Sequence, residues 1–229
     1  MISIVIPLYN RKKTIQETLD SVLRQSYQDF EVLIVNDGST DGPQKKIKKY
    51  LDDPRFKFYD LSENKGAPFA RNHGFKSSKG EFLFFCDADA VLKPDALEVL
   101  LNVLKTNPDK AYAYSSFLWG RKKFKIGEFD SEKLKSGPMI HTMSLIRHEA
   151  FPETGWDESI KKLQDWDLYL TMLNNNQEGI WINRILYQVK TGGTISAWLP
   201  SFAYSLFPFL PKVKKYKQAV KIIKEKHDL

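Results

Sequence analysis

Short apolar runs alternate with amphipathic stretches along the first half of the chain. The continuous runs, rich in β-branched and aromatic residues, predict strands at residues 2–6, 31–35, 56–60 and 81–86. Stretches with apolar residues three or four positions apart predict helices at residues 14–25, 43–51, 67–76 and 94–104. This alternation predicts an α/β fold, in which helices flank a mostly parallel sheet.

The second half of the chain has a less regular pattern. Residues 111–118 and 180–189 predict strands, and residues 164–176 predict a helix. Residues 119–138 mix Gly, Lys and Asp and predict a loop. No repeat or linker is visible, so we expect one domain over residues 1–192 and an aromatic and basic extension over 193–229.

Composition narrows the class of protein. The chain has 229 residues, of which 42% are apolar, enough for one packed core. Its one cysteine, Cys86, excludes an intrachain disulfide and fits a reducing compartment. The first apolar run follows no basic segment and indicates a strand rather than a secretory signal, and no apolar run is long enough for a transmembrane helix. We therefore expect a cytoplasmic protein.

The net charge is +7, and much of it lies in residues 212–229, which contain seven lysines against Glu225 and Asp228. Such a surface attracts nucleic acid, phosphorylated ligands or anionic lipid, although a solvated face is the simpler explanation. Residues 198–211 are rich in aromatic residues, and apolar residues continue at helical spacing through Ile223. The alternatives are an amphipathic helix packed on the domain and a membrane-surface contact over 198–226.

Polar clusters follow three of the predicted strands. Pro7-Leu8-Tyr9-Asn10 follows the first strand, Asn36-Asp37-Gly38-Ser39 the second, and Asp87-Ala88-Asp89 the fourth. In a parallel sheet the carboxyl ends of the strands share one edge, where ligands bind. We therefore expect the three clusters to meet in space.

The D-x-D motif formed by Asp87 and Asp89 predicts a cation site. Two neighbouring carboxylates repel each other, and Mg²⁺ or Mn²⁺ prefers one or two carboxylates together with substrate phosphates. The alternative is a pair of loop residues that cap the helix beginning near Pro94. The apolar strand before the motif and the other two clusters favour the cation site.

Two other residues carry candidate ligand chemistry. Asp37 could accept a hydrogen bond from a nucleobase, with Gly38 allowing a close backbone approach, or it could simply form a turn. Arg71 could grip a phosphate or form an ion pair on a helix surface.

Five motifs in order resemble the family 2 nucleotide-sugar glycosyltransferases with the GT-A fold: VIPLYN, VNDGSTDG, GAPFARN, DAD and GWDESIKKLQDWDLYL. The resemblance covers residues 1–190 and implies a nucleotide-binding half at 1–110 and an acceptor half at 111–192. It implies that Asp165 is the catalytic base and that Asp87 and Asp89 bind the ribose and a divalent metal. The implied donor-binding residues are Pro7, Tyr9, Asn10, Asp37, Gly38, Arg71, Asn72, Asp87, Ala88 and Asp89.

Two positions depart from the family pattern. Gln164 replaces the usual glutamate before Asp165, which alters an acceptor contact and leaves the base in place. Lys190 and Thr191 stand where some relatives have a histidine, so no third, histidine metal ligand is expected there. Lys190 could neutralise a phosphate or lie on the surface. Asp167 is the rival base. Because Asp165 and Asp167 are two positions apart on a predicted helix, they do not share a face.

The resemblance also suggests residues near the acceptor and the sugar. His141 could bind a sugar hydroxyl, and Trp156 and Trp166 could stack on a sugar ring. A structural histidine and core packing of the two indoles are the alternatives.

The expected activity is an inverting, metal-assisted transfer of a sugar from a nucleoside-diphosphate donor, favoured as a UDP-sugar, to a hydroxyl acceptor. A saccharide or lipid-linked saccharide acceptor would place it in polysaccharide, glycolipid or glycoconjugate synthesis, with possible peripheral contact at the cytoplasmic membrane face. The alternatives are a catalytically silent nucleotide-sugar-binding module and a basic nucleic-acid-binding protein. The sequence shows no recognisable nucleic-acid-binding module, so nucleic acid is not expected as a partner.

Overall fold

The computed structural model describes residues 1–191 and 209–229. Its strands are β1 (Ile2–Leu8), β2 (Phe30–Asp37), β3 (Phe56–Leu61), β4 (Phe82–Phe85), β5 (Ala90–Leu92), β6 (Tyr112–Trp119), β7 (Lys122–Phe124), β8 (Leu145–Arg147) and β9 (Gly179–Val189). Its α-helices are α1 (Ile15–Leu23), α2 (Gln44–Ile47), α3 (Ala67–Ser77), α4 (Ala96–Thr106), α5 (Ser131–Ser136), α6 (Gln164–Asn174) and α8 (Pro211–Lys226). Short 3₁₀ turns are η1 (Lys48–Tyr50) and η2 (His148–Ala150).

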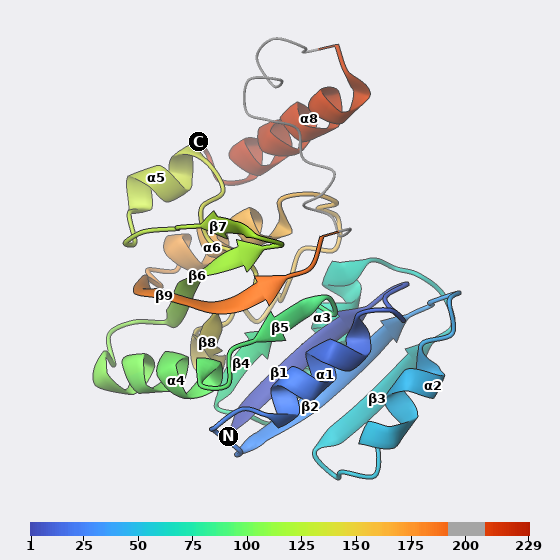
Figure 1. The fold of residues 1–229 in the computed structure, drawn as a ribbon. Coiled ribbons are helices and arrows are strands. Elements are labelled where there is room, and N and C mark those ends of the chain that lie inside the picture. The colour runs from blue at the N-terminus through green and yellow to red at the C-terminus, as the bar shows by residue number, and fades with distance from the viewer. Residues whose placement is uncertain (192–208) are drawn as a thin grey trace.

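The described strands form one nine-stranded sheet, in the order β3-β2-β1-β4-β8-β6-β9-β5, with β7 beside β6 (Figure 1). In the N-terminal half, β3, β2, β1 and β4 are all parallel. Every residue of β2 is buried, as expected for a central strand covered on both faces. Apolar side chains of α1 pack with Ile4 and Ile6 of β1, whereas α3 contributes Phe75 to the cluster that contains Val5. The predicted flanked, mostly parallel sheet is confirmed.

The second half adds strands of mixed direction. β8 is antiparallel to β4 and β6, β9 is parallel to β6, and β5 is antiparallel to β9. The sheet therefore continues across the predicted boundary at residue 110. β5 and β8 were not predicted, because three residues are too few to display a period.

The prediction of a loop over 119–138 is wrong in two places. Gly120, with φ +55°, makes the turn between β6 and β7, where the rings of Phe117 and Phe124 stack 5.0 Å apart. Farther on, the Asp130 carboxylate accepts a hydrogen bond from the Lys133 amide at 3.0 Å and begins α5. The polar composition of this stretch concealed both elements.

The C-terminal helix α8 packs on the domain. Ile223 is fully buried in the same apolar cluster as Trp166 and Tyr169 of α6, and Tyr216, Ala219 and Val220 pack against that cluster. In Figure 1, α8 lies at the margin of the molecule, near α5. The aromatic stretch at 198–208 lies outside the described residues. None of the helices in the described ranges is long and apolar enough to cross a membrane.

Candidate active site

The three polar clusters meet at the carboxyl edge of the parallel strands. The Asn10 amide donates to Ser39 Oγ at 3.0 Å, and the Thr40 amide donates to Asn10 Oδ1 at 2.9 Å. On the other side, Thr14 Oγ1 donates to the Ala88 carbonyl at 2.9 Å. These contacts arise because β1 lies between β2 and β4. The predicted convergence of the three clusters is thus confirmed.

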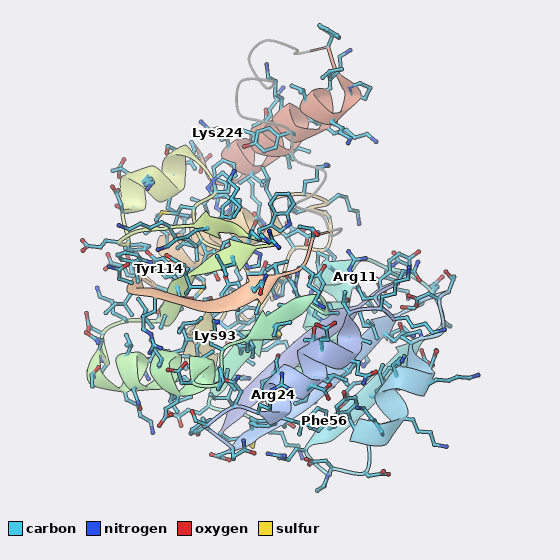
Figure 2. All side chains as sticks on the ribbon, viewed as in Figure 1. Arg11, Arg24, Phe56, Lys93, Tyr114 and Lys224 are labelled. Carbon is cyan, nitrogen blue, oxygen red and sulfur yellow. The ribbon has the colours of Figure 1, made fainter. Side chains whose placement is uncertain are left out.

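Basic side chains surround the two carboxylates of the D-x-D motif. Asp89 Oδ2 accepts a hydrogen bond from Arg11 Nε at 3.2 Å. Arg11 lies beyond the end of β1, far from Phe56 at the start of β3 (Figure 2). Asp87 Oδ1 lies 3.4 Å from Arg71 Nη2, and its Oδ2 lies 3.7 Å from His141 Nε2. The motif therefore joins groups from three separate segments.

The electrostatics of Asp89 leave a role for a further cation. Burial raises the pKa of Asp89, the negative charge of Asp87 raises it further, and Arg11 opposes both effects. Arg11 thus compensates the buried carboxylate only in part. A divalent ion between the carboxylates would favour their charged forms.

The residues present fit a divalent metal that is completed by substrate phosphates. Asp87 and Asp89 supply hard oxygen ligands, and Mg²⁺ or Mn²⁺ sites at diphosphates commonly use only one or two carboxylates. Among residues 1–191 and 209–229, no group of three or more His, Cys, Asp or Glu side chains is arranged to hold a metal. Asp87 and Asp89 alone would therefore supply only part of the ligands of such an ion.

Arg71 connects the D-x-D motif to the start of α6. Its Nη1 donates to Gln164 Oε1 at 3.0 Å, while its Nη2 contacts Asp87. The guanidinium carbon lies 4.6 Å from the centroid of the Trp156 ring, so the cation is also held by an aromatic face. Gln164, the departure from the family pattern, is therefore a direct partner of Arg71.

Asp165 lies in the first turn of α6, close to Arg71 and His141. Its Oδ1 accepts from the Trp166 amide at 3.0 Å. Burial raises the pKa of Asp165, while His141, the Trp166 amide and Arg71 favour the charged form. A carboxyl group whose pKa is raised is a stronger base than an ordinary aspartate, which suits proton transfer from a hydroxyl.

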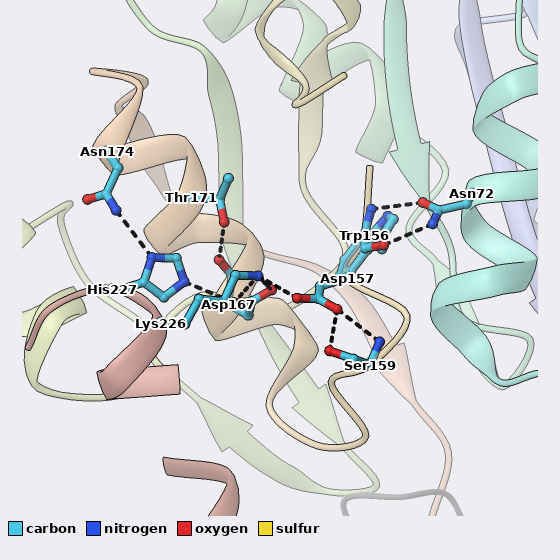
Figure 3. Close-up of polar contacts among 9 residues, drawn as sticks. All are labelled: Asn72, Trp156, Asp157, Ser159, Asp167, Thr171, Asn174, Lys226 and His227. Carbon is cyan, nitrogen blue, oxygen red and sulfur yellow. Dashed lines mark hydrogen bonds and ion pairs between the residues drawn. The ribbon is translucent and has the colours of Figure 1, made fainter. Parts of the chain in front are cut away.

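Asp167, the rival base, is engaged by the C-terminal end of the chain (Figure 3). Its side chain is 4% exposed, and its carboxylate binds Lys226 Nζ and His227 Nε2, each at 2.9 Å. The Asp167 carboxylate is therefore used to hold α8 against α6. The geometry therefore favours Asp165 over Asp167 as a base.

The candidates for nucleobase binding divide into buried and exposed groups. Asp37 is buried, and its two carboxylate oxygens accept from the amides of Lys65 and Gly66, both at 2.8 Å. Asp37 therefore shapes the loop that approaches Gly38, where a Cβ atom would lie 2.6 Å from the Glu63 carbonyl carbon. Tyr9 is 44% exposed and presents an aromatic surface at the same edge.

Two backbone candidates flank this edge. Pro7 lies within β1, and the next residue, Leu8, pairs with Asn36 of β2. Ala88 is buried and lies between the two motif carboxylates in the sequence. Both positions shape the edge through the backbone rather than through polar side chains.

Four predicted site residues use their side chains inside the protein. Asn72 binds the backbone of Trp156 on both sides, with its Oδ1 accepting at 2.8 Å and its Nδ2 donating at 2.9 Å. Trp156 and Trp166 are core side chains, and Trp166 Nε1 donates to a backbone carbonyl, so packing replaces the suggested sugar stacking. The Lys190 side chain pairs with Glu17 of α1, while the Lys190 amide donates to the Asp89 carbonyl at 2.9 Å.

Two contacts of the D-x-D motif were not predicted from the sequence: that of Arg11 with Asp89 and that of His141 with Asp87. Arg11 directly follows the polar cluster after β1, and its charge at that edge was an available signal. His141 Nδ1 accepts from the Met143 amide at 3.3 Å, so the Nε2–H of the neutral ring faces Asp87. Only the fold reveals that residue 141 reaches the D-x-D motif.

Solved structures share this fold. The chain superposes on S. aureus TarS residues 1–349 bound to UDP-GlcNAc with a TM-score of 0.73, at 20% identity over 99% of this chain and 72% of that one. It superposes on mannosyltransferase PcManGT of Pyrobaculum calidifontis, solved with GDP-Man and Mn²⁺, with a TM-score of 0.68, at 20% identity over 82% of this chain and 56% of that one.

Sequence relatives extend the comparison. A chondroitin synthase of Pasteurella multocida is 30% identical over 83% of this chain and 21% of its own length. An uncharacterized glycosyltransferase of Rickettsia conorii is 28% identical over 90% of this chain and 35% of its own length. The chain thus spans about a third or less of these relatives. The model of glycosyl transferase family 2 matches residues 3–155, well over half of the chain, and the chain therefore belongs to this family.

Proposed function

We propose that this chain transfers a sugar from a UDP-sugar donor to a hydroxyl group of a saccharide or lipid-linked saccharide, with inversion, in polysaccharide or glycoconjugate synthesis. The observation that carries the proposal is the double contact of Arg71, which joins Asp87 to Gln164 beside Asp165. Support comes from the similarity to a chondroitin synthase and to a structure bound to UDP-GlcNAc.

In the donor half, Asp87 and Asp89 would hold a divalent metal and the ribose, while Tyr9 and Asp37 would flank the nucleobase. The backbone at Pro7, Asn10, Gly38 and Ala88 would shape the edge of the sheet on which the donor lies. When bound, the metal would neutralise charge on the leaving diphosphate. Arg71 and Arg11 would add positive charge on the same side of the reacting sugar.

In the acceptor half, Asp165 would take the proton of the acceptor hydroxyl. The hydroxyl oxygen would form a bond to the anomeric carbon as the bond to the diphosphate breaks on the opposite face. One such displacement inverts the anomeric configuration. Gln164 would hold Arg71 in place, and His141 would lie between the motif and the sugar hydroxyls.

Calorimetry with UDP, with and without Mn²⁺, tests the donor half. We expect metal-dependent binding that Asp89→Asn abolishes and that the surface control Asp95→Asn retains, since Asp95 pairs with Arg184 away from the motif. Absence of binding to UDP, GDP and dTDP under all conditions would refute the proposed donor class.

Turnover separates an enzyme from a silent binding module. We expect UDP release from a UDP-sugar, and we expect Asp165→Asn to abolish it while UDP binding persists. A silent module would bind UDP without turnover. Loss of turnover in Asp167→Asn, with Asp165→Asn active, would reverse the assignment of the base.

We also propose that the outer face of α8 contacts anionic lipid. Lys214, Lys215 and Lys221 are exposed there, and Ile222 beside them is 45% exposed. The packed face of the helix faces the domain, so contact would use these outer side chains. A lipid-linked acceptor would suit this arrangement.

Sedimentation with phosphatidylglycerol vesicles and with neutral phosphatidylcholine vesicles tests this contact. We expect binding to the anionic vesicles alone, weakened when the three lysines are changed to glutamine. Equal binding of the triple variant, or no binding of the native chain, would refute the contact. Stronger binding to DNA than to vesicles would instead favour the nucleic-acid alternative.

A further inference from the structure

The C-terminal end of α8 binds both ends of the segment that carries Asp165. Lys226 Nζ lies 2.7 Å from Asp157 Oδ2 and 2.9 Å from Asp167 Oδ1, and His227 Nε2 lies 2.9 Å from Asp167 Oδ1 (Figure 3). These four side chains, Asp157, Asp167, Lys226 and His227, are called the C-terminal clasp. They join α8 to the loop before α6 and to the first turn of α6.

The segment between the two aspartates needs such support. It carries Gln164 and Asp165, and it enters α6 through Leu163, whose φ of 59° is left-handed. A non-glycine residue keeps this conformation only where its surroundings hold it. Lys226 binds both Asp157, which precedes Leu163, and Asp167, which follows it.

The opposite side of the segment is held by α3. Asn72 binds the Trp156 backbone and the Glu158 carboxylate, and Arg71 binds Gln164. The segment therefore lies between contacts from α3, which reach toward the D-x-D motif, and contacts from α8. The contacts from α8 lie beyond residue 155, where the family match ends.

From this geometry we propose that Lys226 and His227 are positioning residues for catalysis: by binding Asp157 and Asp167 they hold Asp165 at the donor sugar. The proposal rests on the proposed function, in which Asp165 is the base. Both residues act through their contacts with Asp157 and Asp167. Their role is to keep the segment in the one arrangement that also lets Gln164 bind Arg71.

The protonation of the clasp suits neutral pH. Burial disfavours the charged form of Lys226, but hydrogen bonds to Asp157 and Asp167 outweigh it and raise the pKa of Lys226. His227 Nδ1 lies 3.2 Å from Asn174 Nδ2, so a neutral ring accepts from Asn174 and donates its Nε2–H to Asp167. These two contacts of His227 fit the tautomer that carries its hydrogen on Nε2.

Substitutions on the full chain test the proposal. Lys226→Met removes the charge and keeps the stem, Lys226→Arg keeps the charge, and Lys217→Met is the control on the exposed side of the same helix. We expect Lys226→Met to lower kcat about tenfold or more, as a small displacement of a catalytic group does, with unchanged UDP affinity. Lys226→Arg should restore most of kcat, and Lys217→Met should match the native chain.

Hydrogen exchange of residues 157–167 gives a readout that needs no turnover. We expect faster exchange there in Lys226→Met than in Lys217→Met. If the native chain transfers no sugar, the proposed function fails, and exchange alone then shows whether the clasp holds the segment. Asp157→Asn, which removes one arm, replaces Lys226→Met if that variant does not fold.

Three results would overturn the proposal. The first is native kcat in Lys226→Met. The second is equal exchange of residues 157–167 in the two methionine variants. The third is a parallel loss of kcat and UDP affinity with faster exchange throughout the domain, which would make the clasp a purely structural contact.

Discussion

Asp87 and Asp89 are tolerated beside a buried strand because they lie at its end, where other segments bring positive charge. Arg11 reaches Asp89 from the turn after β1, and Arg71 reaches Asp87 from α3. His141 approaches Asp87 from the segment before β8. The raised pKa of Asp89 shows that burial and the neighbouring carboxylate outweigh Arg11. The protein alone therefore neutralises this charge only in part, as the proposed cation site would require.

The pH dependence of transfer should report Asp165. A base works only when deprotonated, so the raised pKa of Asp165 predicts that kcat falls on acidification at a pH above the ordinary range of an aspartate. Arg71 favours the charged form of Asp165. Arg71→Met should therefore raise this pKa further and move the acidic limb of the kcat profile to higher pH.

The measurement is kcat against pH at saturating donor, using the residual rate of the variant. Arg184→Met is the matched control, since Arg184 pairs with Asp95 on the surface. Its profile should coincide with that of the native chain. An acidic limb that stays in place or moves to lower pH in Arg71→Met would contradict the assignment of Asp165.

At the scale of elements, the loop before α6 depends on one glycine. Gly155 has φ +69°, and a Cβ atom there would collide with Asn72 Oδ1, which accepts from the Trp156 amide. Gly155→Ala should cost about 1–3 kcal/mol of unfolding free energy, through backbone strain and the lost hydrogen bond. Urea unfolding measures it.

Gly137→Ala is the control for this substitution. Gly137 has an extended backbone with φ 175°, and a Cβ atom there meets nothing within 4 Å. Its stability should equal or exceed that of the native chain. Equal stability of the two alanine variants would show that the loop adapts and that Asn72 does not hold it rigidly.

Acid stability should reveal the contact between this loop and α8. Burial raises the pKa of Asp157, but hydrogen bonds from Lys226 and Ser159 outweigh it and lower that pKa to about 2. Because the folded pKa is depressed, the stabilisation is present above the ordinary value of 3.8 and is lost as the pH falls toward 2. Asp157→Asn should therefore lower Tm at neutral pH, with a difference that shrinks between about pH 4 and pH 2. A difference that is constant with pH would contradict this origin.

The predictability of each element followed the strength of its local signal. The buried runs of β1 and β2 and the spaced leucines of α4 were evident from the sequence, because their periods extend over several residues. β5 and β8 are three residues long, and their pairing partners lie far away in sequence. Their existence depends on tertiary pairing rather than on local pattern.

The same distinction applies to the candidate site. The three strand-end clusters were predictable because parallel strands place their ends together. The inward orientation of Asn72 and the clasp on Asp167 were not, since each partner lies tens of residues away along the chain. Sequence spacing identifies the polar residues, and packing decides which of them face a ligand.

At the scale of the whole molecule, the family match and the fold match have different extents. The family model ends at residue 155, whereas the similarity to TarS covers 99% of the chain. Asp165 and α8 both lie in the part beyond the family model. The residues beyond 155 therefore contain both the candidate base and a helix that packs against α6.

Removal of α8 should destabilise the whole domain. A chain that ends at Thr191 would expose the apolar cluster of Trp166 and Tyr169 that Ile223 covers, and would leave the buried Asp167 without Lys226 and His227. Because Lys226 is 35% exposed, the lost ion pair costs less than the roughly 3–5 kcal/mol of a fully buried pair, and the exposed apolar area adds to this cost. We expect a large fall in Tm and stronger binding of an apolar dye. A chain that ends at His227 keeps the clasp and should unfold as the native chain does. If the chain ending at Thr191 were equally stable, α8 would be a dispensable appendage, and the cost of burying Asp167 would have to be met within α6 itself.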